Sequence, residues 1–383
     1  MRYLRVLIFS IFSLSAGLSV SASPQEDLAA CMGKDPDAII MSCTAALTSN
    51  KGGSAEKISE IYFRRGSAYI VSSARYKNSY DLAIADFGSA ISYIGNHAEA
   101  YAGRSLSYFL KSDYKKALVD IDRAIAIKDG NAFFYVEKGD VLLKMNEPEK
   151  AMNEFNKSIF IDNNIADPYQ RRAEIYLSKG LYDLALKDLE RAIALKPRYA
   201  EAYLDRCKAH MGKAAYGEAI ADCDKAISFN PVYAEAYFWR GSLLAVQGAC
   251  QKSIPDLSRF IELQPGDARA YFNRGNCYIA EGLSDLAIVD FGRAVMLRPD
   301  YKAAYNNRAR AYHNKGEEAK ALDDADKAVS LVPQDAISLE TRGEIHEKLR
   351  HTAQADADYR AALQLDPKNA RALDGLTRLG VEK

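Results

Sequence analysis

The chain has 383 residues, of which 48% are apolar and 27% are charged, an ordinary globular composition that excludes disorder as the main state. Lys and Arg total 51, and Asp and Glu total 51. This neutral chain lacks the basic excess of proteins that bind nucleic acid or anionic membranes. One hydrophobic core is unusual at this length, so the alternatives are several domains or an array of repeats in which each unit packs on its neighbours.

The first 22 residues are predicted to be a secretory signal peptide. Arg2 and Arg5 form a short basic start, an apolar run follows over residues 6–20, and the Val-Ser-Ala sequence that ends at Ala22 fits the small-x-small rule for cleavage. Ser and Gly interrupt the short apolar run, which disfavours a membrane-spanning helix. We therefore expect a periplasmic or secreted protein, and membrane contact only if the segment stays uncleaved.

The sequence repeats every 34 residues over most of its length. With positions numbered 1 to 34, eight units begin at Ala98, Ala132, Ala166, Ala200, Ala234, Ala268, Lys302 and Ala336. An earlier unit begins near Ser59 and carries about five extra residues. These nine units cover residues 59–369, with a degenerate helix pair expected over 23–58 and a capping helix expected over 370–383.

The same positions carry the same residue types in each unit. Position 4 is Tyr in eight of nine units, position 8 is always small, position 20 is Ala except at Ser253, and position 27 is small except at Phe260. A Gly or polar residue near position 15 is predicted to end one helix, and Pro at position 32 of the last six units to stop a second. Each unit is therefore predicted to be a helical hairpin, and neighbouring hairpins must stack to bury their apolar faces.

This pattern resembles the tetratricopeptide repeat (TPR) over residues 59–369. The resemblance implies an all-α fold: an α-solenoid, a right-handed superhelix of about nine hairpins, with capping helices at both ends. It also implies that the first helices line a concave groove and that the usual activity is protein or peptide binding. The repeats leave no room for a catalytic domain, so no enzyme is predicted.

The unit that begins at Ala234 departs from the pattern at Cys250, Ser253, Pro255 and Phe260. Pro255 would lie inside the second helix unless that helix starts late, with Ser253 as its N-cap. We therefore expect a locally shortened helix with repacking around Phe260. The alternative is a bend in the superhelix that reshapes the groove.

Position 7 is basic and position 23 is acidic in every unit, as in Arg104 and Asp120. These charges could form a ladder that binds phosphate or peptide. A ligand site rarely repeats nine times in one form, however. A structural ion pair between the two packed helices of each unit is therefore favoured, and it would set register more than stability.

By resemblance to the family, positions 2, 5, 9, 12 and 13 are expected to line the groove. Positions 5 and 12 are mostly apolar in the first seven units, and position 2 adds an acidic edge at Glu60, Glu99, Asp167, Glu201 and Glu235. Such a groove would suit a segment with apolar anchors and some basic residues. The alternative is that neighbouring helices cover position 12 and that the acids favour the helix dipole. The predicted partner-binding residues are Phe63, Ile70, Phe109, Val136, Leu143, Leu177, Leu204, Met211, Phe238, Phe272 and Ile279.

Six cysteines fit an exported protein that contains disulfides. Cys31 and Cys43 flank a Gly-Lys-Asp-Pro turn, so a bridge between them is predicted to hold the N-terminal helix pair together. Two more pairs are either bridges or buried free thiols. They are Cys207 with Cys223 and Cys250 with Cys277.

Searches for other sites give no match. Some TPR proteins grip the C-terminal carboxylate of chaperones with a clamp that needs Lys at position 5, which no unit has, although Asn273, Asn276 and Asn307 match other parts of that clamp. The run HEKLRH, from His346 to His351, looks like a zinc-protease helix. Its histidines would lie roughly 140° apart around a helix, so they are not expected to share a face. No metal or cofactor is predicted.

The sequence thus predicts an exported, non-catalytic scaffold that holds a protein or peptide segment in its groove and binds no nucleic acid. Two alternatives stay open. One is an accessory subunit or regulator of envelope or cell-surface glycan assembly. The other is self-association through the groove or through an end of the array.

Overall fold

The computed structural model describes residues 31–48 and 53–380. Over these residues the chain forms 20 α-helices, α3 to α22, and no strand, so the predicted all-α solenoid is confirmed. The chain divides into two compact units, unit 1 up to Pro197 and unit 2 from Arg198. Among the helices of the described ranges, none has the length and apolar character needed to cross a bilayer.

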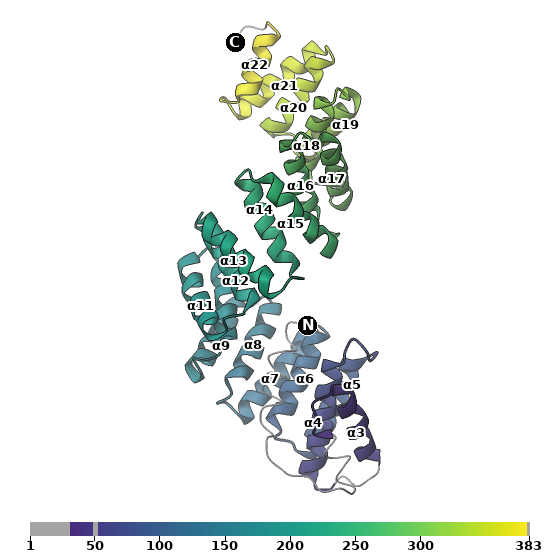
Figure 1. The fold of residues 1–383 in the computed structure, drawn as a ribbon, viewed down its shortest axis with the longest axis vertical. Coiled ribbons are helices and arrows are strands. Elements are labelled where there is room, and N and C mark those ends of the chain that lie inside the picture. The colour runs from purple at the N-terminus through teal and green to yellow at the C-terminus, as the bar shows by residue number, and fades with distance from the viewer. Residues whose placement is uncertain (1–30, 49–52, 381–383) are drawn as a thin grey trace. The chain divides into compact units, whose positions relative to one another are not determined.

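Unit 1 contains α3 (Pro36–Thr48) and four hairpins (Figure 1). The hairpins are α4 (Ala55–Val71) with α5 (Ser79–Tyr93), α6 (Ala98–Leu110) with α7 (Tyr114–Ile127), α8 (Ala132–Lys144) with α9 (Pro148–Ile161), and α10 (Asp167–Ser178) with α11 (Tyr182–Leu195). Helix α4 begins before Ser59, the expected start of the first repeat. The predicted signal peptide over residues 1–22 lies outside the described residues and stays a prediction.

Unit 2 contains five hairpins and the final helix α22 (Ala370–Arg378). The hairpins are α12 (Ala200–Gly212) with α13 (Tyr216–Phe229), α14 (Ala234–Val246) with α15 (Cys250–Leu263), α16 (Ala268–Ala280) with α17 (Ser284–Leu297), α18 (Lys302–Asn314) with α19 (Glu318–Leu331), and α20 (Ala336–Lys348) with α21 (Thr352–Leu365). Seven of the eight repeat starts from Ala98 to Ala336 coincide with the first residue of a helix. The exception is α10, which starts one residue late.

The turn inside each of the eight hairpins from α6–α7 to α20–α21 passes through a left-handed residue at position 15. Glycine occupies this position in four hairpins, with φ between 70° and 76°, and other residues occupy it in four more, with φ between 58° and 64°. The residues are Ser112, Asn146, Gly180, Ala214, Gly248, Gly282, Gly316 and Arg350. A side chain with a Cβ atom is disfavoured there, so the geometry of the hairpin imposes the turn even where glycine is missing.

Small residues at positions 8 and 20 let the two helices of a hairpin pack closely, as predicted. A Cβ atom added to Gly139 would lie 2.3 Å from Cε1 of Phe155, and one added to Gly275 would lie 2.7 Å from Cε1 of Phe291. Protein interiors are close-packed, so these rings leave no room for a side chain on the facing helix. The alanines at position 20 are fully buried: Ala83, Ala117, Ala151, Ala185, Ala219, Ala287, Ala321 and Ala355.

Helix α15 corrects the expectation of a shortened helix. It runs over 14 residues with Pro255 inside it, and its N-cap is Ala249. Ser253 does not cap the helix, because its buried hydroxyl donates to the carbonyl oxygen of Gly241 at 2.7 Å. Pro255 is exposed and near the start of the helix, so the carbonyl of Gln251 that it leaves without a donor lies in the exposed first turn, where water can reach it. Phe260 is fully buried beside Phe238.

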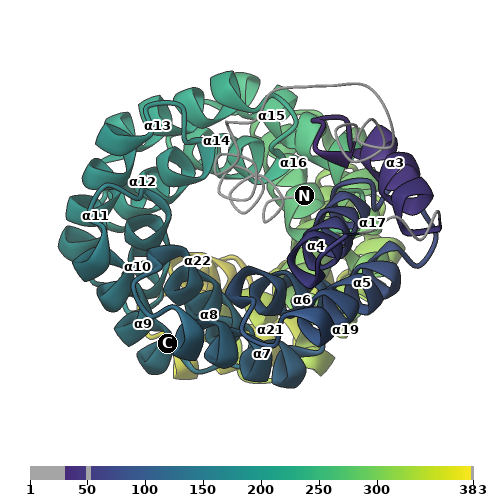
Figure 2. The ribbon, with the colours of Figure 1, turned by 90° about the horizontal axis from the view of Figure 1, so that it is seen from below.

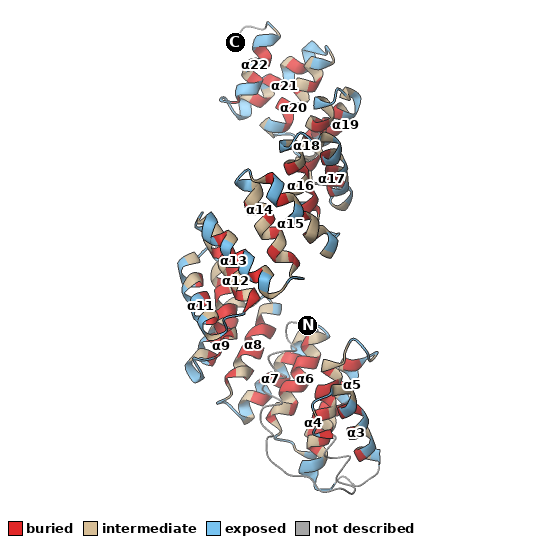
Figure 3. Cartoon of the chain, in the orientation of Figure 1, coloured by how far each residue is buried: buried red, intermediate tan, exposed pale blue. Residues whose placement is uncertain are grey.

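Within each unit, the first helices of the hairpins lie on one side and the second helices on the other. In unit 2, α14 and α16 lie on the inner, concave side, and α13 and α15 lie on the outer side (Figure 2). In unit 1, α4 and α6 lie on the inner side of α5 and α7 (Figure 2). Buried residues are concentrated along the bodies of the helices, whereas exposed residues gather at the turns (Figure 3). A ligand of either concave face would therefore meet the first helices.

Candidate functional site

Each repeat hairpin in the described residues carries the ion pair predicted between positions 7 and 23. In eight hairpins an Arg donates through Nε and Nη2 to both carboxylate oxygens of an Asp, at 2.6–2.8 Å. In the hairpin of α8 and α9, Lys138 Nζ lies 3.5 Å from Glu154 Oε1. The structural interpretation of these charges is confirmed.

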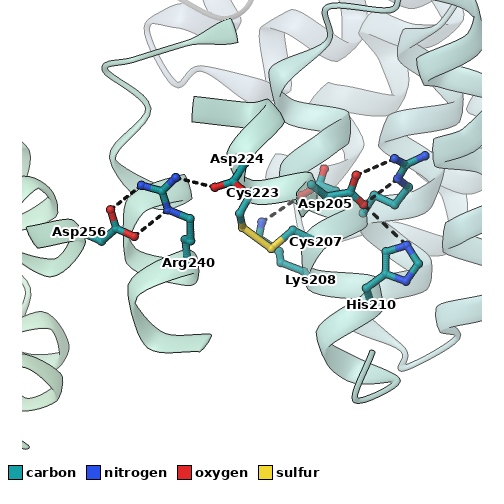
Figure 4. Close-up of a disulfide and its surroundings, with 10 residues drawn as sticks. Asp205, Cys207, Lys208, His210, Cys223, Asp224, Arg240 and Asp256 are labelled. Carbon is teal, nitrogen blue, oxygen red and sulfur yellow. Dashed lines mark hydrogen bonds and ion pairs between the residues drawn. A yellow bond between two sulfur atoms is a disulfide. The ribbon is translucent and has the colours of Figure 1, made fainter. Parts of the chain in front are cut away.

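Several of these arginines also reach the preceding hairpin. Arg240 binds Asp256 of its own hairpin, and its Nη1 donates to Asp224 of α13 at 2.6 Å (Figure 4). The guanidinium of Arg240 also lies 5.8 Å from the ring centroid of Tyr237, and the same contact between positions 7 and 4 recurs in other hairpins. The guanidinium donors of these arginines therefore bind residues of the protein itself, where bidentate pairs fix the geometry and register of the packed helices.

Six of the eleven predicted partner-binding side chains are buried, with 0–7% of their surface exposed. They are Phe63, Ile70, Phe109, Val136, Leu204 and Phe238. Position 5 packs inside its own hairpin: the ring centroid of Phe63 lies 5.8 Å from that of Phe87. Such side chains cannot touch a partner while the hairpins are packed. The expectation that these six line an open apolar groove is therefore corrected.

The other five predicted residues are partly buried, and they are Leu143, Leu177, Met211, Phe272 and Ile279. Met211 packs against the core around Leu204, and the ring centroid of Phe272 lies 4.9 Å from that of Tyr301. Ile279 lines a pocket on the concave side of unit 2. A role in partner binding stays a prediction for these five.

Ion pairs within unit 1 compensate the predicted acidic edge there. Glu60 pairs with Arg64 at 2.5 Å, and Glu99 pairs with Lys128 at 2.9 Å. Asp167 lies 3.8 Å from Lys196. The acids of position 2 in this unit therefore present little uncompensated charge to a ligand.

Positions 9 and 6 of consecutive first helices meet on the concave side. In unit 1, Nε of Arg171 on α10 lies 2.9 Å from Oδ1 of Asp140 on α8, and both side chains are mostly buried. Nη1 of Arg171 also lies 3.3 Å from Oε2 of Glu174. Burial raises the pKa of Asp140 to about 6 even though Arg171 acts in the opposite direction. The charges at this crossing are thus paired with one another.

Glu137 is a second buried acid on α8, with 6% of its surface exposed. Burial raises its pKa to about 8, the hydroxyl of Ser105 lowers it, and the negative charges of Asp140 and Asp120 raise it further. Glu137 is therefore mostly protonated and neutral at pH 7.

The concave side of unit 2 holds a pocket of about 410 Å³ between α16, α18, α20 and α22. It is lined by Asn276, Ile279, Asn307, Arg310, Ala311, His313, Asn314, Glu344 and Arg371. Nδ2 of Asn307 donates to Oδ1 of Asn276 at 2.7 Å, and one hairpin earlier Nδ2 of Asn273 donates to Oγ of Ser242 at 3.0 Å. Amide side chains thus replace the ion pair seen at the crossing in unit 1.

Arg310 and Glu344 form no ion pair with any other described residue within 4 Å. The position that meets Arg310 on the next first helix is Thr341, whose hydroxyl donates to the carbonyl of Ile337 in its own helix at 2.9 Å. Arg371, in contrast, lies 3.4 Å from Oε1 of Glu340. Burial raises the pKa of Glu340, and the charge of Arg310 acts in the opposite direction and lowers it. The pocket therefore combines a cation and an anion that have no ion pair within 4 Å in the described residues with an amide pair and Ile279.

A larger pocket of about 540 Å³ lies in unit 1 between α7, α8 and α9, and its charged groups are paired. Lys138 lies 3.0 Å from Asp122, Lys150 lies 2.6 Å from Glu147, and Lys157 lies 3.3 Å from Glu154. Volume therefore does not decide which pocket is the better site. Arg310 and Glu344, which have no ion pair within 4 Å among the described residues, favour the pocket in unit 2.

Sequence reasoning considered Asn273, Asn276 and Asn307 only as fragments of a carboxylate clamp, and it did not predict Arg310 or Glu344. A usable signal was present, because positions 9 and 6 of consecutive units lie 31 residues apart. This crossing holds opposite charges at Asp140 and Arg171 but amides at Asn276 and Asn307. The spacing alone did not show that the two positions touch.

Two cysteine pairs have their sulfur atoms at bonding distance: Cys31 and Cys43 at 1.99 Å, and Cys207 and Cys223 at 2.21 Å. Cys207 and Cys223 occupy positions 8 and 24 and join α12 to α13 (Figure 4). The structure thus brings together the pair predicted near the N-terminus and one of the two pairs that the sequence left open.

His346 and His351 meet, contrary to the sequence expectation. Helix α20 ends at Lys348 and the chain turns through Arg350, with φ of 62°, so helical spacing does not extend to His351. The two Nδ1 atoms lie 3.2 Å apart. No group of three or more His, Cys, Asp or Glu side chains in the described part of the chain is arranged to hold a metal ion.

Sequence-family models match several stretches of the chain. Models described as tetratricopeptide repeat match residues 134–165, 268–301, 285–336 and 336–369, and one described as TPR repeat matches residues 173–213. Tetratricopeptide repeats are thus recognised in these stretches of the chain. TPR proteins bind protein or peptide partners, and the TPR fold is typically a non-catalytic scaffold.

Solved TPR structures resemble the chain. The C-terminal part of a TPR repeat-containing protein from Cytophaga hutchinsonii is 25% identical, with a TM-score of 0.50 over 62% of this chain and 98% of that one. YrrB, a TPR protein with an unusual peptide-binding site, is 27% identical, with a TM-score of 0.45 over 49% of this chain and 97% of its own. A comparison with curated proteins found no match.

Proposed function

We propose that the protein is a non-catalytic TPR scaffold that holds an extended segment of another protein on the concave face of unit 2. The observation that carries this proposal is the pocket between α16 and α22, where Arg310 and Glu344 lack ion-pair partners among the described residues beside the Asn276–Asn307 amide pair. Unpaired charges in a concavity are available to a ligand, whereas the paired charges of unit 1 are not.

The donors and acceptors of the pocket suit a polypeptide. The bond from Asn307 Nδ2 to Asn276 Oδ1 uses one donor and one acceptor, which leaves Nδ2 of Asn276 and Oδ1 of Asn307 free to bind a backbone C=O and N–H. Arg310 can bind a carboxylate through two parallel hydrogen bonds, and Glu344 can bind a basic group. Ile279 supplies an apolar contact. The expected partner segment therefore carries both acidic and basic side chains around a small apolar one.

We also propose that the protein works outside the reducing cytoplasm, in the periplasm or as a secreted protein. The two cysteine pairs at bonding distance and the signal-like sequence of residues 1–22 support this location. Disulfides persist in such compartments, while the cytosol keeps thiols reduced.

The test is photocrosslinking in cells from a photoreactive residue placed at Ile279 or Asn314, which line the pocket, or at Val289. Val289 is the control, because it is 69% exposed on α17 and lies outside the pocket. We expect one discrete protein band from the pocket positions, absent at Val289. Arg310→Ala should reduce the intensity of the band from the pocket positions about tenfold, since a charge-assisted hydrogen bond to the partner contributes about 1.5–3 kcal/mol.

Three outcomes would contradict this function. Equal bands at Val289 and the pocket, or no band from either pocket position, would remove the site. A band that contains only the protein itself would assign the face to self-association instead.

A further inference from the structure

Cys250 and Cys277 lie in contact in the interior of unit 2. Their Sγ atoms are 2.6 Å apart, and the two residues are 6% and 1% exposed. Cys250 is the first residue of α15, the second helix of one hairpin, and Cys277 lies on α16, the first helix of the next. The two residues stand at repeat positions 17 and 10.

The repeat explains why these two positions face each other. In unit 1, Tyr114 and Val141 occupy positions 17 and 10, and they pack in one cluster with Phe109 and Ala117. This is an ordinary apolar contact between consecutive hairpins. At the α15–α16 junction, two cysteines replace both members of that contact. Each would serve as a small apolar residue by itself, but together they hold two thiols where a bond can form.

We propose that Cys250 and Cys277 form a third disulfide, one that joins consecutive hairpins. The inference rests on the proposed location outside the cytoplasm, because a reducing compartment would keep both thiols free. The oxidant is a disulfide of a carrier protein or a small molecule. One cysteine thiolate attacks that disulfide and forms a mixed disulfide with it. The second cysteine then displaces the carrier, so the pair loses two electrons and two protons while the oxidant becomes two thiols.

The bond must form before the two hairpins finish docking. Both thiols are buried in the folded unit, out of reach of a carrier. Burial, with the hydrogen bond to Cys277 acting in the same direction, raises the pKa of Cys250 to about 12, and a protonated thiol is not a nucleophile. The partly folded chain exposes both groups to exchange, and docking then encloses the bond.

This disulfide would act on the proposed binding face. Helix α16 carries Asn276 and Ile279 of the pocket, and the bond would tie α16 to α15 of the preceding hairpin. The pair Cys207–Cys223 lies within one hairpin, so it does not restrain the angle between hairpins. A crosslink between hairpins restricts their relative motion and so holds one wall of the pocket in place.

The first experiment is differential alkylation of the full chain purified from its own cells. Free thiols are blocked in denaturant with one reagent, the protein is reduced, the new thiols are labelled with a second reagent, and peptides are assigned by mass spectrometry. We expect the second label on all six cysteines, together with a linked Cys250–Cys277 peptide before reduction. If the first reagent labelled Cys250 and Cys277 but none of the other four cysteines, these two thiols would be free. That result would overturn this inference but would not contradict the proposed location outside the cytoplasm. The first label on all six would overturn both.

The second experiment follows hydrogen exchange of α16 after the denatured protein is refolded with or without reductant, because the bond is enclosed once the hairpins have docked. We expect reductant to speed exchange of the α16 amides at least severalfold in the wild type. In the matched variant with Cys250→Ala and Cys277→Val, which retains Cys207 and Cys223, the reductant should have no effect on α16. An equal reductant effect in this variant would assign the change to Cys207–Cys223 and contradict the proposal.

Discussion

The concave sides of the two units use the same crossing of first helices in different ways. In unit 1, Arg171 lies 2.9 Å from Asp140, and these two mostly buried side chains form an ion pair. In unit 2, the corresponding crossings bring Asn307 to Asn276 and place Thr341, which carries no charge, opposite Arg310. The scaffold ion pair between positions 7 and 23 is nevertheless the same in both units, as Arg172–Asp188 and Arg308–Asp324 show.

This difference separates the residues that stabilise the array from those that determine which groups its concave side offers to a ligand. Positions 7 and 23 connect two helices of one hairpin, so every repeat needs them. Positions 6 and 9 meet only across hairpins, and they vary without loss of the fold. Whether a charge on the concave side is available to a ligand depends on the residue one hairpin away, and four predictions test this comparison.

The largest contrast is expected between two arginines on the concave side. Arg171→Ala should destabilise unit 1 by about 3 kcal/mol, because it leaves Asp140 buried beside Glu174 and Asp167 without its cation. Arg310→Ala should change stability by less than about 1 kcal/mol, because Arg310 has no ion pair within 4 Å among the described residues and acts on the buried Glu340 only through its charge, which opposes the rise that burial causes in the pKa of Glu340. Urea unfolding followed by circular dichroism measures both. Equal losses would mean that Arg310 is a structural residue.

A second prediction concerns pH and Glu137. Its folded pKa of about 8 lies above its ordinary value, so its contribution to stability is complete below about pH 4.5 and is lost as pH rises through 8. Asp140, with a pKa of about 6, acts with the same sign. Unit 1 should lose up to about 5 kcal/mol between pH 5 and pH 8.5, about 4 from Glu137 and about 1 from Asp140, since one pKa unit corresponds to about 1.4 kcal/mol.

Glu137→Gln should flatten most of that pH dependence, because glutamine is neutral at every pH. Thermal unfolding between pH 5 and pH 9 compares the two proteins, and a variant as pH-dependent as the wild type would contradict the assignment. The matched change Glu190→Gln, at an exposed acid on α11 of the same unit, should keep the slope.

A third prediction asks whether the helices beneath the unit 2 pocket are as tightly packed as those of unit 1. Ala287→Leu should cost roughly 1–3 kcal/mol, because Ala287 is fully buried at the contact between α16 and α17. Ala221→Leu, at an exposed position of α13, serves as the control and should be close to neutral. An unchanged melting temperature for Ala287→Leu would contradict the repeat register.

The smallest expected effects lie in the turns. Ala214 has φ of 58°, so Ala214→Gly should stabilise its hairpin by up to about 1 kcal/mol. Gly248→Ala should destabilise the next hairpin by a similar amount, since φ there is 74° and no neighbouring atom crowds the site. Melting temperatures that move in the same direction for both changes would show that loop contacts, rather than φ, control these turns.

Much of the scaffold could be predicted from the sequence. The helix starts, the breaks at position 15, the close contact at positions 8 and 20, and the ion pairs at positions 7 and 23 all follow from one 34-residue pattern. These features depend on residues within one hairpin, and their recurrence from hairpin to hairpin makes each of them visible in the sequence. Pro255 is the exception, because the pattern did not show that an exposed first turn tolerates the lost hydrogen bond.

The sequence by itself therefore determined the hairpins and their stacking, because local propensity and the spacing of apolar residues are written along the chain. Only the tertiary structure decided which groups a partner can reach. Phe63 and Phe238 were expected on the groove but pack inside, because side chains of their own hairpins cover them. The states of Arg171 and Arg310 depend on a residue one hairpin away. Exposure and charge pairing arise from contacts between hairpins, and such contacts exist only once the hairpins are stacked.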